Sequence, residues 1–178
     1  MLSKLRFIAF IGLFAATVSQ ADLVIDVQGV AQPTPVAIVP FGWEGNAPAV
    51  PLDVSKVITD DLKRSGRFAP VSEDKMLQKP TDGADVDFQD WSFVGVEAVV
   101  VGKVIQTGDN TYTLQFQLFD VFGRRQLVGF SMPGVTRATM RGAAHRAADM
   151  IYEKLTGIKG VFGTKVAYVT AKQQGEGR

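Results

Sequence analysis

The sequence contains no cysteine and a single histidine, His145. The absence of cysteine excludes disulfide bonds, thiol nucleophiles and cysteine-ligated metals. A zinc site would need carboxylates for every ligand besides His145, which is an uncommon donor set. No G-x-S-x-G motif marks a nucleophilic serine. We therefore interpret His145 as a structural or surface residue and expect neither a metal, nor a cofactor, nor enzyme activity.

An excess of charge of one sign is also missing, since 19 Lys and Arg stand against 18 Asp and Glu. Such a balanced chain has no long-range field that would draw it to nucleic acid or to anionic lipid. Glycine and aspartate clusters do not match the spacing of phosphate or calcium loops. Two groups of charged residues are interpreted as solvated helix faces: Asp60 with Asp61, and Arg137, Arg141, Arg146 and Lys154.

No apolar run is long enough to span a membrane, which takes about 20 residues. The longest one, residues 7–18, follows the positive Lys4 and Arg6 and precedes small residues at Ser19 and Ala21. This pattern is typical of a secretory signal peptide over residues 1–21, cut between Ala21 and Asp22. A retained anchor or a buried first helix is the alternative. We expect an exported, periplasmic protein.

Residues 22–35 after the predicted cut are expected to form an extended N-terminal arm. Leu23, Ile25 and Val27 would lie on one side of an extended strand, with Asp22, Val24 and Asp26 on the other. Pro33 and Pro35 would keep this stretch from continuing into the next strand.

The first half of the body shows alternating strand and helix patterns. A short strand is expected at 36–41 and a Gly- and Pro-rich loop at 42–51. Asp53 is a plausible N-cap of a helix whose apolar stripe recurs at three- and four-residue steps and which ends at Gly66. A brief strand at 68–71 follows, then a mostly irregular stretch, and one or two helical turns at 87–95.

The second half predicts three strands and a long helix. The stretch 96–105 is almost wholly apolar, so we expect it at the sheet centre, covered on both faces. Residues 112–118 alternate as in a half-buried antiparallel strand, and 126–132 returns beside it. A helix is expected at 136–156, capped by Gly157, and a last strand at 165–170. The order predicts an α/β (α+β) fold, a small mixed sheet with two main helices on one face.

Short runs spread along residues 22–170 are similar to those of one known family. They are Val39-Pro40-Phe41 with Trp43, Asp61-Leu62 with Ser65-Gly66, Phe68 and Pro70, residues 98–102, Gln117-Leu118 with Asp120, residues 153–160, and Phe162, Thr164 and 167–169. In this order, behind a signal peptide, they resemble the N-terminal domain family of TolB, a component of the Tol-Pal system.

The resemblance implies a non-enzymatic periplasmic protein that maintains outer-membrane integrity and helps the outer membrane constrict at division. It implies that the arm binds TolA through Asp22, Leu23, Val24, Ile25, Asp26, Val27, Gln28 and Gly29. Family members also carry a β-propeller that binds Pal and is exploited by some colicins. That propeller is missing here, so we expect a fragment or a truncated gene, with a TolB-like domain at 36–160 and the start of a propeller strand and a polar tail at 161–178.

A small-molecule or peptidoglycan-binding domain, or an enzyme, remains the alternative function. Deleting the arm separates the two hypotheses, because only a partner-binding arm would lose its function while the fold stays intact.

Overall fold

The computed structural model describes residues 32–164, 167 and 169. The predicted signal peptide and its cut, the predicted arm to residue 31, and most of the predicted strand at 165–170 lie outside these residues. The elements are β1 Thr34–Ile38, β2 Gly42–Glu44, α1 Val54–Arg64, β3 Phe68–Pro70, the 3-10 turns η1 Glu73–Lys75 and η2 Gly83–Asp85, α2 Phe88–Val94, β4 Ala98–Gly108, β5 Thr111–Asp120, β6 Arg125–Val135 and α3 Met140–Thr156.

The strands form one mixed sheet in the order β3-β1-β4-β5-β6, which confirms the predicted fold class. β1 is parallel to both of its neighbours, β3 and β4, whereas β4, β5 and β6 are antiparallel. β4 therefore lies at the centre, as predicted. β2 is also parallel to β4 and pairs farther along it, at residues 103–105.

The stretch 42–51, predicted as a loop, contains β2, so that prediction is wrong for its first three residues. Trp43 explains the added strand. Its ring packs against Tyr112 with centroids 6.1 Å apart, and its indole N–H donates to the Ala47 carbonyl at 2.8 Å. This anchor holds residues 42–44 against β4 despite the break at Pro40.

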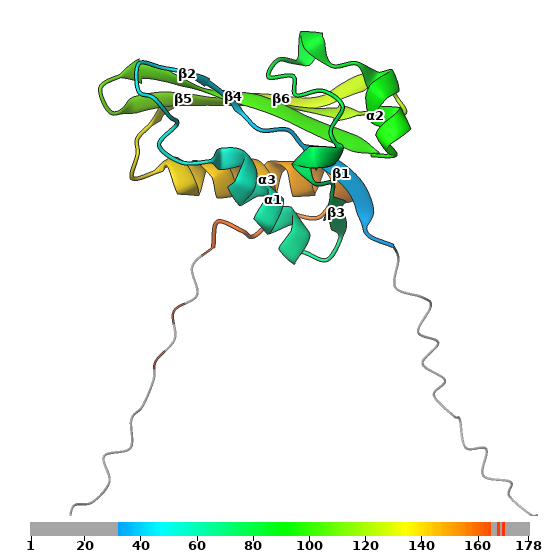
Figure 1. Cartoon of the computed structure of the whole chain (residues 1–178). Coiled ribbons are helices and arrows are strands. Elements are labelled where there is room, and N and C mark those ends of the chain that lie inside the picture. Colours follow the sequence, from blue (N-terminus) through cyan, green and yellow to red (C-terminus); the bar gives the residue numbers. More distant parts are fainter. Residues whose placement is uncertain (1–31, 165–166, 168, 170–178) are drawn as a thin grey trace, which may run out of the picture. The chain divides into compact units, whose positions relative to one another are not determined.

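The sheet has an apolar layer on each face. Helices α1 and α3 lie side by side under one face (Figure 1), and their stripes pack on Val36, Val100 and Leu118. On the other face, Trp91 of α2 is buried against Val99 and Val101. The near-continuous apolar sequence of β4 is explained by these two layers, as predicted.

The predicted caps of both main helices are present, and only the start of α3 differs from the prediction. The Asp53 carboxylate accepts a hydrogen bond from the Lys56 amide at 3.0 Å and caps α1. Gly66 and Gly157 take left-handed φ values of 70° and 71° just after α1 and α3. α3 begins at Met140 instead of 136, because Thr136 and Thr139 close a separate turn in which the Thr139 amide donates to the Thr136 carbonyl at 3.1 Å.

Candidate functional site

The predicted partner-binding residues 22–29 lie outside the described residues, but the root of the arm is well defined. Gln32 and Pro33 are exposed. The Thr34 amide then donates to the Arg67 carbonyl at 2.9 Å, and the Glu97 amide donates to the Pro35 carbonyl at 2.9 Å. The chain therefore enters the body between β3 and the start of β4, held from both sides.

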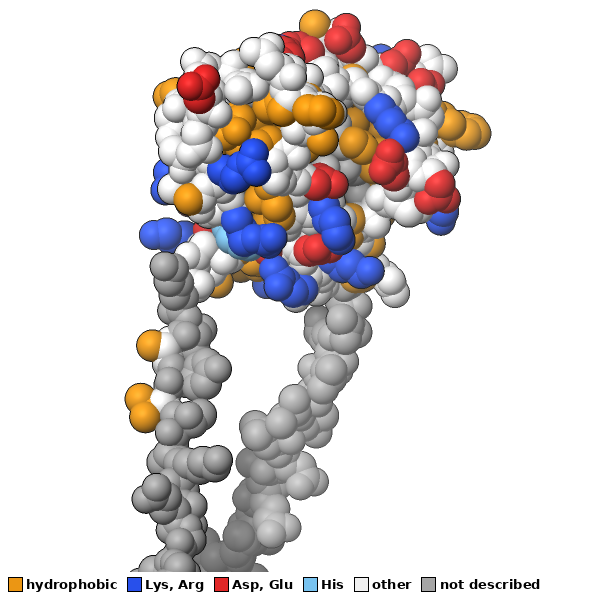
Figure 2. Space-filling model, turned by 60° about the vertical axis from the view of Figure 1, so that its left-hand side comes forward, with side chains coloured by type: hydrophobic (Ala, Val, Ile, Leu, Met, Phe, Trp, Pro, Cys, Tyr) orange, Lys and Arg blue, Asp and Glu red, His pale blue; other side chains and the backbone are white. Residues whose placement is uncertain are grey.

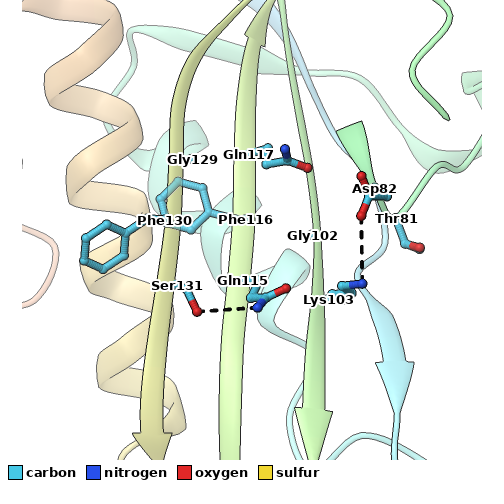
Figure 3. Close-up of a pocket in the computed structure, with 10 residues that line it drawn as sticks. All are labelled: Thr81, Asp82, Gly102, Lys103, Gln115, Phe116, Gln117, Gly129, Phe130 and Ser131. Atoms are coloured by element: carbon cyan, nitrogen blue, oxygen red, sulfur yellow. Dashed lines mark hydrogen bonds and ion pairs between the residues drawn. The ribbon is translucent and has the colours of Figure 1, made fainter. Parts of the chain in front are cut away.

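A first surface site is a groove of about 300 Å³ on the sheet face opposite α1 and α3. Figure 3 shows Gln115, Ser131 and Lys103 across three strands, with Asp82 and Thr81 beside them. Lys103 Nζ lies 3.1 Å from Glu44 Oε1 and 3.9 Å from Asp82 Oδ2. These polar groups hold neighbouring segments on the sheet and leave no unpaired charge for chemistry.

A second cluster links the two main helices. His145 Nδ1 of α3 lies 2.6 Å from Asp61 Oδ2 of α1, and Arg64 pairs with the other carboxylate oxygen. Asp61 is fully buried. The interpretation of Asp61 as part of a solvated face is therefore wrong, although it holds for Asp60, whose side chain is 51% exposed.

The position of Asp61 follows from helix geometry. It lies three residues after Ile58 and four after Val57, on the stripe that faces α3. A carboxylate can occupy that stripe because it meets His145 and Arg64 there. The interpretation of His145 as structural is confirmed, since it joins two packed helices.

A third surface site, of about 930 Å³, runs along α3 and is called here the α3 groove. Three segments line it. They are residues 132–135 at the end of β6; Ala138 and Thr139 before α3, with Arg141, Gly142, Ala143, His145, Arg146 and Asp149 in α3; and Lys159, Gly160, Phe162, Gly163 and Thr164 after it. The prediction of Arg141 and Arg146 as exposed is confirmed, but no pattern in the sequence indicated that they border a groove.

Asp149 forms one wall of the α3 groove by folding the chain back after α3. Its carboxylate accepts hydrogen bonds from the amides of Phe162 at 2.6 Å and Gly163 at 3.3 Å. The Phe162 ring packs edge-on against Tyr152, with centroids 5.6 Å apart. The segment 158–164 is thus attached to the helix.

Within the part of the chain that the structure describes, no group of three or more His, Cys, Asp or Glu is placed to hold a metal ion. In the same residues, no helix combines the length and the apolar character needed to cross a membrane.

Comparison with known proteins points to one family. Two curated relatives named Tol-Pal system protein TolB are each 45% identical to this chain. The one from Thioalkalivibrio sulfidiphilus matches over 158 residues and the one from Nitrosococcus oceani over 160, in both cases 88% of this chain and 36% of the relative. The chain thus spans little more than a third of the length of these relatives.

A solved structure agrees in both fold and sequence. The crystal structure of TolB from Acinetobacter baumannii matches with a TM-score of 0.60 at 32% identity, over 72% of this chain and 30% of that one. The model of the TolB amino-terminal domain matches residues 23–127, more than half of the chain. On these matches, the chain belongs to the family of TolB amino-terminal domains.

Proposed function

We propose that this chain is a periplasmic, partner-binding component of the Tol-Pal envelope system, and that its N-terminal arm binds TolA. The observation that carries the proposal is the family match, which begins at residue 23 and so includes the arm. The relatives are named for the Tol-Pal system. Through that contact the chain would contribute to outer-membrane integrity and to constriction at division, by binding and not by catalysis.

We propose that the first 21 residues direct export and are removed by a cut between Ala21 and Asp22. Amino-terminal sequencing of the periplasmic form should give Asp22 as the first residue. A start before Leu13, or an intact precursor in the membrane, would contradict this.

We propose that the arm binds by adding a strand to an exposed sheet edge of TolA. Leu23, Ile25 and Val27 would enter pockets on the partner, and the backbone would supply the ladder hydrogen bonds. No proline occurs before Pro33, so every amide of this stretch can donate. The firm attachment of β1 at Thr34 keeps the body in place behind the arm.

Two substitutions at one position test the strand mechanism. Ile25→Ala should weaken binding to the C-terminal domain of TolA about tenfold or more, since a buried Ile side chain contributes about 1.5–3 kcal/mol. Ile25→Pro should weaken it further, because proline also removes a ladder hydrogen bond. Gln32→Pro, beyond the alternating stretch, is the control and should bind normally. Titration calorimetry measures all three. Equal affinities for the two Ile25 variants would show that the arm does not bind as a strand.

Deletion of residues 22–31 separates this function from the alternative of a small-molecule or peptidoglycan-binding domain. Both apolar layers are built from residues after 35, so the deletion should leave the melting temperature unchanged. TolA binding should be lost. The proposed function is wrong if the shortened chain binds TolA as before. It is also wrong if the chain sediments with isolated peptidoglycan but does not bind TolA.

A further inference from the structure

The charges of the α3 groove are strongly one-sided. Arg141, Arg146 and Lys159 line it, and none of them pairs with a carboxylate in the described part of the chain. Among the described residues, Asp149 is the single acidic one that lines the groove, and its two oxygens already accept the amides of Phe162 and Gly163. In Figure 2, several Lys and Arg side chains gather around the histidine on the lower half of the face shown. The groove therefore attracts anionic groups.

The floor of the groove is apolar. Met132, Val135 and Ala143 each keep 6–8% of their surface exposed, and Phe162 is half-buried beside them. A small hydrated anion would make no favourable contact with such a floor. A peptide with apolar side chains between acidic ones would bury the apolar side chains on the floor and pair the acidic ones with the cations.

The shape of the groove fits an extended chain. From Arg141 to Asp149 the helical wall is about 12 Å long, and an extended peptide of four residues spans about 13 Å. Near the start of this wall, a Cβ on Gly142 would meet no atom within 4 Å. The missing side chain lets another backbone approach the helix closely.

We propose that the α3 groove is a docking site for an acidic, apolar, extended peptide segment of a partner protein. The acidic side chains meet Arg141, Arg146 and Lys159, and the apolar ones between them cover the floor. None of the described residues that line the groove belongs to the arm, and the proposal does not depend on the proposed binding of TolA.

The test uses the chain from Asp22 onward, labelled with ¹⁵N, and a synthetic peptide of sequence Glu-Leu-Asp-Val-Glu-Leu with blocked ends. Saturable amide shifts are expected at residues 141–146 and 159–164, and they should weaken with added salt. The same peptide with Lys at the three acidic positions should cause none. Absence of saturable shifts, or shifts confined to other surfaces, would overturn the proposal.

Matched variants show whether the groove itself binds. Arg141→Ala with Arg146→Ala should reduce affinity at least tenfold, and Gly142→Leu should abolish binding by filling the groove while favouring helix. Lys154→Ala is the control, because it removes a cation of the same helix that does not line the groove. A melting curve of each variant reports its fold. Equal losses of peptide affinity in the control and in the Arg variants would contradict the proposal that the peptide binds in the α3 groove.

The chain's own arm is the competing occupant. Removing residues 22–31 should leave the groove amides unchanged when no peptide is present. If those amides shift, and the peptide then binds more tightly, the groove holds the chain's own segment and the partner proposal is wrong.

Discussion

Two adjacent carboxylates of α1 should respond very differently to the same substitution. Asp61→Ala leaves His145 and Arg64 without their buried partner and opens space between α1 and α3. We expect it to lower the free energy of unfolding by about 3 kcal/mol, as for other broken buried pairs. Asp60→Ala removes a surface ion pair with Lys56 at 3.2 Å and should cost less than about 1 kcal/mol. Urea denaturation of both variants measures the difference, and equal effects would show that the buried link does not stabilise the helix pair.

The same reasoning applies to a single apolar residue of β4. Val100 is 1% exposed, so Val100→Asp would place an unpaired charge among apolar side chains. We expect loss of cooperative unfolding, or a loss of at least about 4 kcal/mol. Thr107→Asp, at an exposed position of the same strand, is the control and should change stability little. Circular dichroism melts measure both variants, and an unchanged midpoint for Val100→Asp would contradict the burial of β4 under α1 and α3.

The burial of single residues could be predicted from the sequence where apolar residues recur at the period of a helix or a strand. The stripe of α1 and the alternation of β5 identify buried positions because helices and strands repeat at 3.6 and 2 residues. Asp61 lies on the same stripe and was misassigned, since a period alone does not show that a carboxylate will find a buried partner. That partner, His145, comes from a helix distant in the sequence.

At the scale of elements, the turn between β5 and β6 should make stability depend on pH. The Asp120 carboxylate accepts the Gly123 amide at 2.9 Å, and this bond, with a further one from Arg125 Nε, holds the pKa of Asp120 below its usual value. A lowered pKa in the folded state means that the ionised form stabilises the fold above the ordinary pKa of about 4. That contribution is lost as the pH falls through the lowered value.

Asp120→Asn should therefore destabilise the domain at pH 7 and have no more than a residual effect near pH 2. Asp109→Asn in the exposed turn before β5 is the control. Chemical denaturation at several pH values measures both. A difference from the parent chain that stays constant between pH 7 and pH 2 would show that the Asp120 charge is not involved.

The kinds of element were predictable, but their pairing was not. Apolar runs, together with patterns of period 2 and 3.6, identified the helices and every strand except β2. β2 is three residues long, too short for a pattern, and it depends on the contact of Trp43 with Tyr112. The place of β1 between β3 and β4 follows from tertiary packing, which no local pattern contains. Of the candidate sites, the arm stays a prediction from alternation, whereas the α3 groove is formed by the packing of three segments within residues 132–164, which no local pattern contains.

For the whole molecule, the extent of the folded body is open to a truncation test. Ending the chain after Gly157 removes the contacts of Phe162 with Tyr152 and Asp149, and should lower the melting temperature by several degrees at about 2–4 °C per kcal/mol. Ending it after Thr164 keeps these contacts and should change the melting temperature little. Equal midpoints for the two truncations would show that residues 158–164 do not belong to the body, which bears on the domain end expected at residue 160.

The position of β1 has a mechanical consequence. The arm continues directly into β1, which is hydrogen-bonded to β3 on one side and to β4 on the other. A force that pulls on the arm therefore runs along β1 and loads both ladders in shear, so that many hydrogen bonds must break together. An edge strand, or one pulled sideways, would come apart one bond at a time. Pulling on the arm is thus resisted by two ladders at once, because β1 lies inside the sheet and not at its edge.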